Sequence, residues 1–423
     1  MKLTHIAWSA VAGLCTATLL AQPLHALAQL PPMRVVAAGP LAEPVPQTGA
    51  NADALRRNLS QIALPPGFRI ALYAVVPGAR HMALAPSGDM LFVGTRDSTV
   101  WAVSDRQHTG VASAVRAFAP ALGFKSPNGV CWSRDGALVV AEINRVRIFP
   151  AAESSFESPQ VTVGDIVPQG QLAPPAYISS GHGARTCRVG PDNKLYVTVG
   201  QPYNVPPAEK YQELERLGVG ALLRMQLDGS GREIYARGIR NSVGQDFNPQ
   251  DGTLWWTDNQ TDGLGNDVPP GELNRSTRAG QHFGYPYWNG HYKVAGSAVA
   301  ADLRDMPEPA NAVFPEIEFP AHQAQLGMVF YTGSMFPSRY RGGIFVAAHG
   351  SWNRSPPSGA LVNFVSLKAD GRANTSEVFA QGWLRPESGT YTGRPVDVAV
   401  LPDGSLLISD DHAGAIYRVS YGN

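Results

Sequence analysis

Three short clusters of polar residues in this sequence combine residue types that can carry out chemistry. The first runs from Ser179 to Arg185, and in it His182 stands between two glycines. Glycine neighbours leave room for a ligand to approach closely, and a neutral histidine can accept a proton near pH 7. We interpret His182 as a candidate general base. A loop histidine that bonds to the backbone is the structural alternative.

The second cluster runs from Gly238 to Gly244 and places Arg240 next to Asn241. A guanidinium presents a planar fork of N–H donors, which suits a carboxylate or a quinone oxygen. This pair is therefore a candidate binding group for an oxygen-rich ligand. A structural salt bridge is the other interpretation of the arginine.

The third cluster is the acidic segment from Thr257 to Asn274, in which four carboxylates alternate with glycines and amides. Oxygen ligands on an irregular loop suit a hard cation such as calcium. The spacing is not that of an EF-hand. A solvated acidic loop is the alternative to a metal site.

The elements that must position these clusters repeat along the chain. One pattern occurs six times: an apolar strand, a turn rich in Pro, Asp and Gly, and a second apolar strand. Asp-Gly and Asp-Asn turns supply the positive φ that tight hairpins need. A single hairpin cannot bury both of its faces, so the copies must pack against one another. The copies cover residues 82–93, 129–140, 186–197, 244–256, 328–347 and 396–408.

This repetition predicts an all-β fold, a six-bladed β-propeller with four-stranded blades around a central channel. We expect the strand Phe68–Ala74 to complete the last blade; two unrelated β domains are the alternative. Loops that precede the inner strands should gather at one mouth of the channel, where ligands usually bind. His182, Arg240, Asn241 and Arg394 are expected to meet there. The aromatic-rich insertion at residues 281–292 is expected to form a wall or lid.

The composition excludes several classes of function. The chain has 423 residues, with 34 basic residues balanced by 34 acidic ones, and this argues against a nucleic-acid partner. No P-loop, G-x-S-x-G or H-E-x-x-H motif occurs. Gly218-Val-Gly220 lacks the third glycine of a Rossmann dinucleotide site.

The first 28 residues have the organisation of a secretory signal peptide. Lys2 precedes an apolar stretch from Ile6 to Leu20, and a small-residue site ends at Ala28. The apolar run is too short to span a membrane, and no later segment reaches that length. We expect a periplasmic or secreted protein with no membrane span. Residues 29–66 are interpreted as a Pro- and Ala-rich tail with a helical turn near 53–61, and residues 67–423 as the propeller.

Only Cys131 and Cys187 remain after this cleavage. Two cysteines are not a disulfide framework, and no C-x-x-C-H motif for a covalent haem occurs. Two buried thiols are the favoured interpretation. A single disulfide in an oxidising compartment is the alternative.

Taken in order, these segments resemble the soluble pyrroloquinoline quinone (PQQ) dependent sugar dehydrogenases, most closely their sorbosone dehydrogenase-like branch. The resemblance spans about residues 64–420. It is carried by His182 with residues 190–200, by Arg240-Asn241, by residues 272–274 with 280–286, and by residues 394–398 with 402–404.

The resemblance implies a six-bladed propeller that holds PQQ and calcium and oxidises a sugar or a sugar aldehyde, with an external electron acceptor. It implies that His182 is the catalytic base and that Arg240 stabilises charge on the quinone. Asn241 and Arg394 would contact the cofactor. The implied calcium ligands lie at Gln260, Thr261, Asp267 and Glu272.

Three positions depart from the glucose-oxidising branch. Gly181 replaces an acidic residue, only one arginine occurs near Arg394, and the lysine expected near residue 350 is absent. His349 or Arg354 would take the place of that lysine. A calcium-dependent lactonase and a non-catalytic binding propeller are the alternatives to a dehydrogenase.

Overall fold

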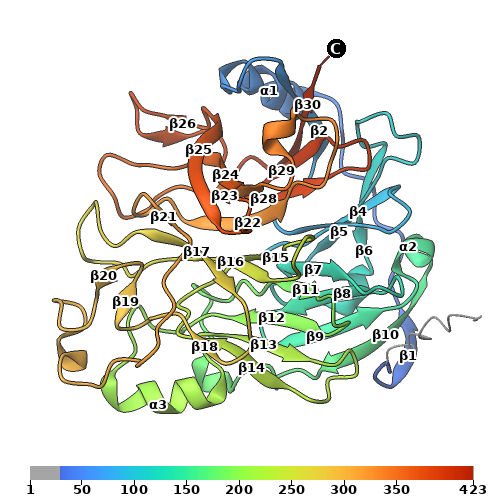
Figure 1. Ribbon diagram of the computed structural model, residues 1–423. Helices are drawn as coiled ribbons and strands as arrows, with labels where there is room; N and C mark the ends of the chain where they lie inside the picture. Colours follow the sequence, from blue (N-terminus) through green and yellow to red (C-terminus); the bar gives the residue numbers. More distant parts are fainter. Residues whose placement is uncertain (1–28, 423) are drawn as a thin grey trace, which may run out of the picture.

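The computed structural model describes residues 29–422, and the predicted signal peptide at residues 1–28 lies outside this range. Six small antiparallel sheets lie around a common centre, which confirms the all-β six-bladed propeller (Figure 1). Among the described residues, no helix is long and apolar enough to cross a membrane.

Each of the six sequence copies forms the first two strands of one blade. The first three blades are β3 (Met82–Leu84), β4 (Met90–Val93), β5 (Val100–Ser104), β6 (Ala114–Phe118); β7 (Gly129–Trp132), β8 (Leu138–Glu142), β9 (Arg145–Phe149), β10 (Gln160–Val167); and β11 (Cys187–Val189), β12 (Leu195–Val199), β13 (Ala221–Met225), β14 (Glu233–Arg237).

The last three blades follow the same order from the centre outwards. They are β15 (Gly244–Phe247), β16 (Leu254–Asp258), β17 (Gly271–Ser276), β21 (Ile317–Phe319); β22 (Gln325–Phe330), β23 (Ile344–Ala348), β24 (Leu361–Leu367), β25 (Ala373–Gln381); and β28 (Pro395–Val400), β29 (Leu406–Asp410), β30 (Ala415–Tyr421), β2 (Phe68–Val75). The turns between the first two strands use positive φ, as at Gly136 (77°), Asn193 (58°) and Gly404 (86°).

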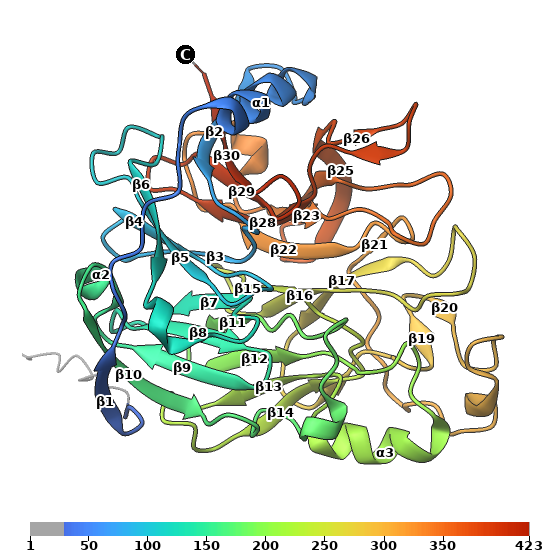
Figure 2. The same ribbon diagram turned by 180° about the vertical axis from the view of Figure 1, so that it is seen from behind.

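The inner strands close into a ring. β3 contacts β7, and the contacts continue through β11, β15, β22 and β28 back to β3. These six strands lie at the centre of the view from behind (Figure 2). β2 pairs antiparallel with β30 along Phe68–Val75, so a segment that precedes the first blade completes the last one, as expected.

The blades form because both faces of each sheet are buried against neighbours. Trp255 and Trp256 are adjacent on β16 and point to opposite faces. Trp255 packs against Phe330 at the interface with the fifth blade, and Trp256 against Phe283 at the interface with the third. Both indoles are fully buried. A two-layer sandwich would bury only one of them in its core.

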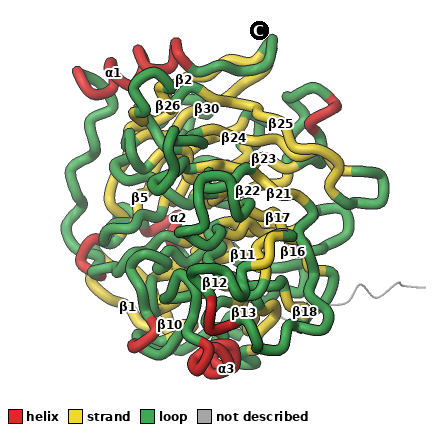
Figure 3. Tube along the Cα trace, turned by 90° about the vertical axis from the view of Figure 1, so that its left-hand side faces the viewer, coloured by secondary structure: helices red, strands yellow, loops and turns green. Residues whose placement is uncertain are grey.

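The segment 29–66 is more than a covering tail. β1 (Met33–Ala37) pairs with β10 and adds a fifth strand to the second blade. The expected helical turn is the helix α1 (Ala50–Asn58), followed by a 3₁₀ turn, Leu59–Gln61. α1 lies at the edge of the molecule far from α3 (Ala208–Leu217), as the side view shows (Figure 3).

The insertion between β17 and β21 packs against the third and fourth blades. It contains β18 (Gln281–His282), which joins the third blade in parallel with β14, and the hairpin of β19 (Trp288–Asn289) and β20 (Tyr292–Lys293). Tyr287 packs edge-on against Tyr211 of α3, with ring centroids 5.8 Å apart. The remaining elements are α2 (Ala152–Ser155), the hairpin β26 (Leu384–Arg385) and β27 (Thr390–Tyr391), and 3₁₀ turns at Pro120–Leu122, Pro175–Tyr177, Ala301–Leu303 and Ser338–Tyr340.

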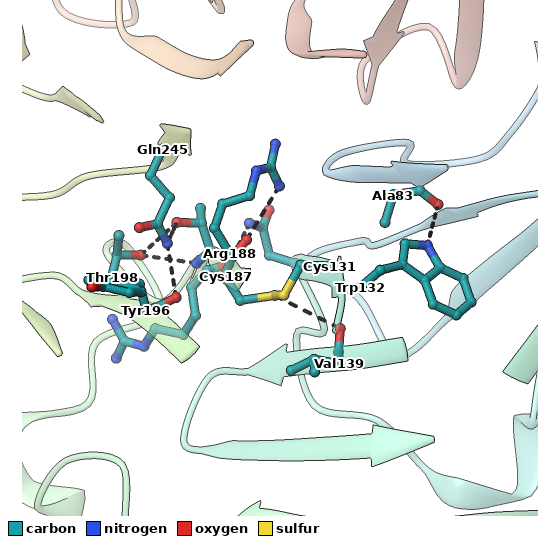
Figure 4. Close-up of a disulfide and its surroundings, with 12 residues drawn as sticks. Ala83, Cys131, Trp132, Val139, Cys187, Arg188, Tyr196, Thr198 and Gln245 are labelled. Atoms are coloured by element: carbon teal, nitrogen blue, oxygen red, sulfur yellow. Dashed lines mark hydrogen bonds between the residues drawn. A yellow bond between two sulfur atoms is a disulfide. The ribbon is translucent and has the colours of Figure 1, made fainter. Parts of the chain in front are cut away.

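The cysteines form a disulfide, so the favoured interpretation as two thiols is wrong. Cys131 on β7 and Cys187 on β11 are bonded, with their Cα atoms 5.8 Å apart (Figure 4). Both side chains are buried. Their separation of 56 residues does not itself show that the inner strands of consecutive blades lie side by side in a propeller.

Candidate active site

One cavity lies at the end of the propeller where the inner strands begin. Because neighbouring strands are antiparallel, the start of each first strand and the end of each second strand meet at the same edge. Loops of both kinds line this cavity. Its charged and polar lining residues are Arg80, Arg96, His182, Arg240, Asn241, Asn259, Gln260, Asp262, His322, His349 and Asn353.

His182 is held so that one ring nitrogen stays available. Its Nδ1 lies 2.6 Å from the carbonyl oxygen of Gln201. A carbonyl oxygen only accepts, so Nδ1 carries the hydrogen and Nε2 of the neutral ring keeps its lone pair. Burial, with a smaller contribution from the Arg240 guanidinium, lowers the pKa of His182 to about 4. The ring is therefore neutral at pH 7 and able to accept a proton.

Gly200 allows His182 and Asn241 to approach each other. A Cβ at this position would stand 2.7 Å from Asn241 Oδ1 and 3.0 Å from the His182 Cβ. Any side chain would push the two residues apart. Arg185 supports the same loop, because its guanidinium donates to the carbonyl oxygen of His182 at 2.9 Å.

Arg240 is fixed by four hydrogen bonds that leave one donor unused. Its Nε and two terminal nitrogens donate to main-chain and side-chain oxygens of Asn204, to Asn259 O and to Asp262 Oδ2. A guanidinium has five N–H groups, so one remains for a ligand. The loop itself is held by Asp258, whose carboxylate accepts from the backbone N–H groups of Arg240 and Asn241 at 2.8 and 2.7 Å.

A second network of charged and polar side chains borders the cavity on the first, fifth and sixth blades. Arg80 donates to Asn128 and to Asp411, and Asp411 Oδ1 accepts from His349 Nε2 at 2.8 Å. The Arg80 guanidinium and the hydrogen bonds from His349 and Arg80 hold the pKa of Asp411 well below its usual range, against the effect of burial. Burial lowers the pKa of His349 to about 4 although Asp411 opposes it. His349 is thus a neutral, oriented ring on the cavity wall.

Arg394 does not line the cavity. Its guanidinium donates to the main-chain carbonyls of His349, Gly350 and Ser351, with distances of 3.0, 2.6 and 3.4 Å. The structure therefore brings His182, Arg240, Asn241 and His349 together and places Arg394 behind His349, where it supports the loop.

The expected calcium ligands separate into three places. Gln260 lines the cavity. Thr261 donates from its N–H and hydroxyl to Asn289 Oδ1, and Asn289 in turn donates to Glu272. Asp267 is exposed and pairs with Arg354 at 3.0 Å.

Glu272 is also poorly suited to stay charged here. It lies opposite Asp258 in the pairing of β16 with β17, and burial together with that neighbour raises its pKa. Its oxygens accept from Asn274 and from the N–H of Gly290. Among the described residues, no three His, Cys, Asp or Glu side chains gather as a metal cluster.

Two amide oxygens instead have the character of ligand groups. Asn241 Oδ1 and Gln260 Oε1 are buried, and neither has a hydrogen-bond partner within residues 29–422. An unsatisfied buried oxygen is costly, so such atoms indicate a missing partner. Both belong to residues that line the cavity. A hard cation bound by amide and main-chain oxygens fits this donor set.

Sequence reasoning missed several lining residues. Arg80 stands two residues before the inner strand β3, as Arg185 does before β11, so its position in the repeat could have identified it. Asp262 lies in the acidic segment, where its spacing does not distinguish it from the neighbouring carboxylates. Arg96, His322 and Trp352 lie on loops of different length with no shared motif, and nothing in the sequence pointed to them.

Comparisons with known proteins agree with this architecture. An uncharacterized protein of Borreliella burgdorferi is 31% identical over 373 aligned residues, which cover 86% of this chain and 91% of that protein. A PQQ-dependent pyranose dehydrogenase of Coprinopsis cinerea is 32% identical over 127 residues, covering 26% of this chain and 17% of that protein.

Two solved structures share the fold at low identity. A Trichoderma reesei structure of carbohydrate-active enzymes family AA12 has a TM-score of 0.70 at 19% identity and covers 86% of this chain and 98% of its own. The PQQ domain of the Coprinopsis cinerea pyranose dehydrogenase, in its holo form, has a TM-score of 0.65 at 18% identity, over 85% and 97% of the two chains. Residues 76–422 match the family described as TrAA12-like, and the chain belongs to that family.

Proposed function

We propose that this protein is an exported dehydrogenase that uses PQQ and calcium to oxidise a sugar or a sugar aldehyde, sorbosone-like compounds included. The observation that carries the proposal is the cavity itself, where a neutral histidine with a free Nε2 faces guanidinium groups and unsatisfied amide oxygens. The names of the Coprinopsis cinerea and Trichoderma reesei proteins support the same class of chemistry.

The charge of the cavity suits an anionic cofactor. Arg80, Arg96 and Arg240 line it, with Asp262 as the one lining carboxylate among the described residues. PQQ carries carboxylates and quinone oxygens, which guanidinium groups bind well. Arg80 and Arg240 would hold PQQ, and Gln260 with Asn241 would supply oxygens to calcium. When bound, PQQ would supply the two-electron acceptor and calcium would polarise it.

Two residues of the chain would then carry out the chemistry that the protein itself supplies. His182 Nε2 accepts the proton of the substrate hydroxyl while the substrate loses its hydride. Arg240, with its other donors fixed, offers its remaining N–H to a ligand oxygen without moving. The external electron acceptor would have to reach the same cavity, because the bound PQQ would have to be reoxidised before another turnover.

The decisive experiment reconstitutes the protein with PQQ and calcium and compares His182→Ala with His291→Ala. His291 is an exposed histidine that pairs with Glu318 away from the cavity, so its variant controls for loss of any histidine. We expect PQQ affinity to stay near wild type in both. Turnover with aldoses or sorbosone should fall about 100- to 10,000-fold in His182→Ala alone.

Three outcomes contradict the proposal in different ways. Absence of PQQ binding, with no absorbance of bound quinone, favours the non-catalytic propeller. Lactone hydrolysis that needs calcium and no PQQ favours the lactonase. Normal turnover per bound PQQ in His182→Ala removes His182 from the mechanism.

A further inference from the structure

A second hollow adjoins the candidate active site and shares a wall with it. Asp262, Trp352 and Asn353 line both cavities, and the outer hollow continues over Asn204, Asn266 and Val299. A molecule bound at His182 could therefore extend past this wall without leaving the protein surface.

Trp352 is the unusual member of the wall. Its side chain is 78% exposed, the most exposed of the large hydrophobic residues described between 29 and 422. Most other tryptophans of this protein are buried or half-buried in the blades. An indole that is left bare beside a cavity keeps its flat apolar face for a ligand.

The backbone that carries Trp352 is held firmly on both sides. Ser351 N donates to Ser358 O at 2.8 Å, and Asn353 Nδ2 donates to Asp262 Oδ1 at 2.6 Å. Further along the loop, Arg354 donates to Asn266 O at 3.0 Å, and Asn266 Nδ2 donates to Ser355 O at 2.7 Å. These bonds tie the loop after β23 to the loop after β16. The ring is thus exposed on a fixed support, which reduces the entropy that a ligand must remove on binding.

The polar groups around the hollow complement this apolar face. Asp262 accepts one bond at each carboxylate oxygen, from Asn353 and from Arg240, and each oxygen can accept another. In the same network, the side-chain oxygen of Asn204 accepts from Arg240 and from the N–H of Asp262, and its NH2 group donates to Asp262 O. One N–H of that NH2 group is left for a ligand. A flat apolar surface beside fixed carboxylate and amide groups is the chemistry that binds a sugar ring, which has C–H faces and a rim of hydroxyls.

We propose that this hollow is a subsite for a second sugar unit, with Trp352 as its stacking platform, so that the protein acts on the end of a di- or oligosaccharide. The inference rests on the proposed function in that the reacting unit lies at His182. The subsite itself is a binding property of the chain and can be measured without turnover.

The experiment measures binding of glucose and cellobiose to the protein without added cofactor, by calorimetry, and then repeats it with four variants. We expect cellobiose to bind about tenfold more tightly than glucose, the effect of one good stacking contact. Trp352→Ala should remove this preference and Trp352→Phe should keep most of it. Val299→Trp, which fills the outer hollow, should bring the affinity for cellobiose down to that for glucose.

Phe314→Ala is the matched control. Phe314 is an exposed aromatic residue on the insertion, stacked on His291 and outside both cavities, so its loss should change neither affinity. Equal binding of the two sugars by the wild type, or a preference that survives both Trp352→Ala and Val299→Trp, overturns the subsite. Loss of turnover in His182→Ala together with an intact cellobiose preference separates the subsite from the proposed catalysis.

Discussion

The protonation state of His182 is the residue-scale property on which the proposed chemistry depends. Burial and Arg240 lower its pKa to about 4, against about 6.5 for an exposed histidine. We expect an NMR titration of the cofactor-free protein to show a midpoint near pH 4 for this ring. Arg240→Met should raise the midpoint by removing the nearby cation, yet leave it below 6.5 because burial remains. A midpoint near 6.5 in the wild type would contradict the described environment.

The same shift links His182 to stability. Between pH 6.5 and about 4 the unfolded chain binds this proton and the folded chain does not, so protonation favours unfolding. The contribution of His182 to stability is therefore lost as the pH falls through this range. In His182→Gln, the loss of unfolding free energy between pH 6.5 and 4 should be smaller than in the wild type, as measured by urea unfolding at each pH. An unchanged loss would contradict the lowered pKa.

At this scale, sequence reasoning found residues that share a position in the repeat and missed those that do not. His182, Arg240 and Asn241 precede inner strands, and all three line the cavity. Trp352 lies on an irregular loop, and its role depends on a partner loop that is about 90 residues away in sequence. Arg394 also precedes an inner strand, but its guanidinium donates to carbonyl oxygens of the neighbouring loop and does not reach the cavity. The spacing of residues in the sequence does not reveal which rotamer a side chain adopts.

The disulfide is a feature of elements, because it joins the inner strands of two consecutive blades. Its Cys131 and Cys187 are 56 residues apart. A closed loop of that length restricts the unfolded chain by an amount worth about 4 kcal/mol. We expect Cys131→Ala with Cys187→Ala to lower the free energy of unfolding by roughly that amount, measured by guanidinium unfolding.

Its control is the wild type with reducing agent. Because both sulfurs are buried, native protein should resist reduction, and the loss of stability should emerge only when unfolding exposes the bond. A double variant as stable as the wild type would mean that the two cysteines are not bonded in the folded protein.

The first two strands of each blade were the elements that the sequence pattern identified best. Apolar runs on either side of a turn marked the first two strands of each blade, because these strands are the most buried, and in three blades that turn is Asp-Gly. The outer strands carry mixed polar residues on one face, and β1 and β18 come from outside their blades in sequence. No local sequence pattern predicts which distant segment will pair with an open sheet edge.

Closure of the propeller is a property of the whole molecule, and β2 contributes to it by completing the last blade. Phe68 begins this strand and packs edge-on against Phe336, Tyr340 and Phe379, with ring centroids 4.7 to 5.3 Å apart. These three aromatic residues lie in the fifth blade, and Phe68 also pairs with Tyr421 of β30 in the sixth. Phe68 therefore holds a strand from before the first blade against the last two blades.

Phe68→Ala should therefore lower the free energy of unfolding, because it leaves a cavity and weakens the attachment of β2 to the rest of the propeller. Phe68 is only partly buried, so we expect a loss of about 2 to 3 kcal/mol, at or below the lower end of the range for large aromatic truncations. Hydrogen exchange should show that the backbone amides of β2 and β30 lose protection first, because their pairing joins a segment from before the first blade to the last strand of the chain. Arg69→Ala, on the same strand with an exposed side chain, is the control and should change neither quantity appreciably. If Phe68→Ala lowered protection uniformly across all six blades, β2 would be an ordinary part of the core and not the closing element of the propeller.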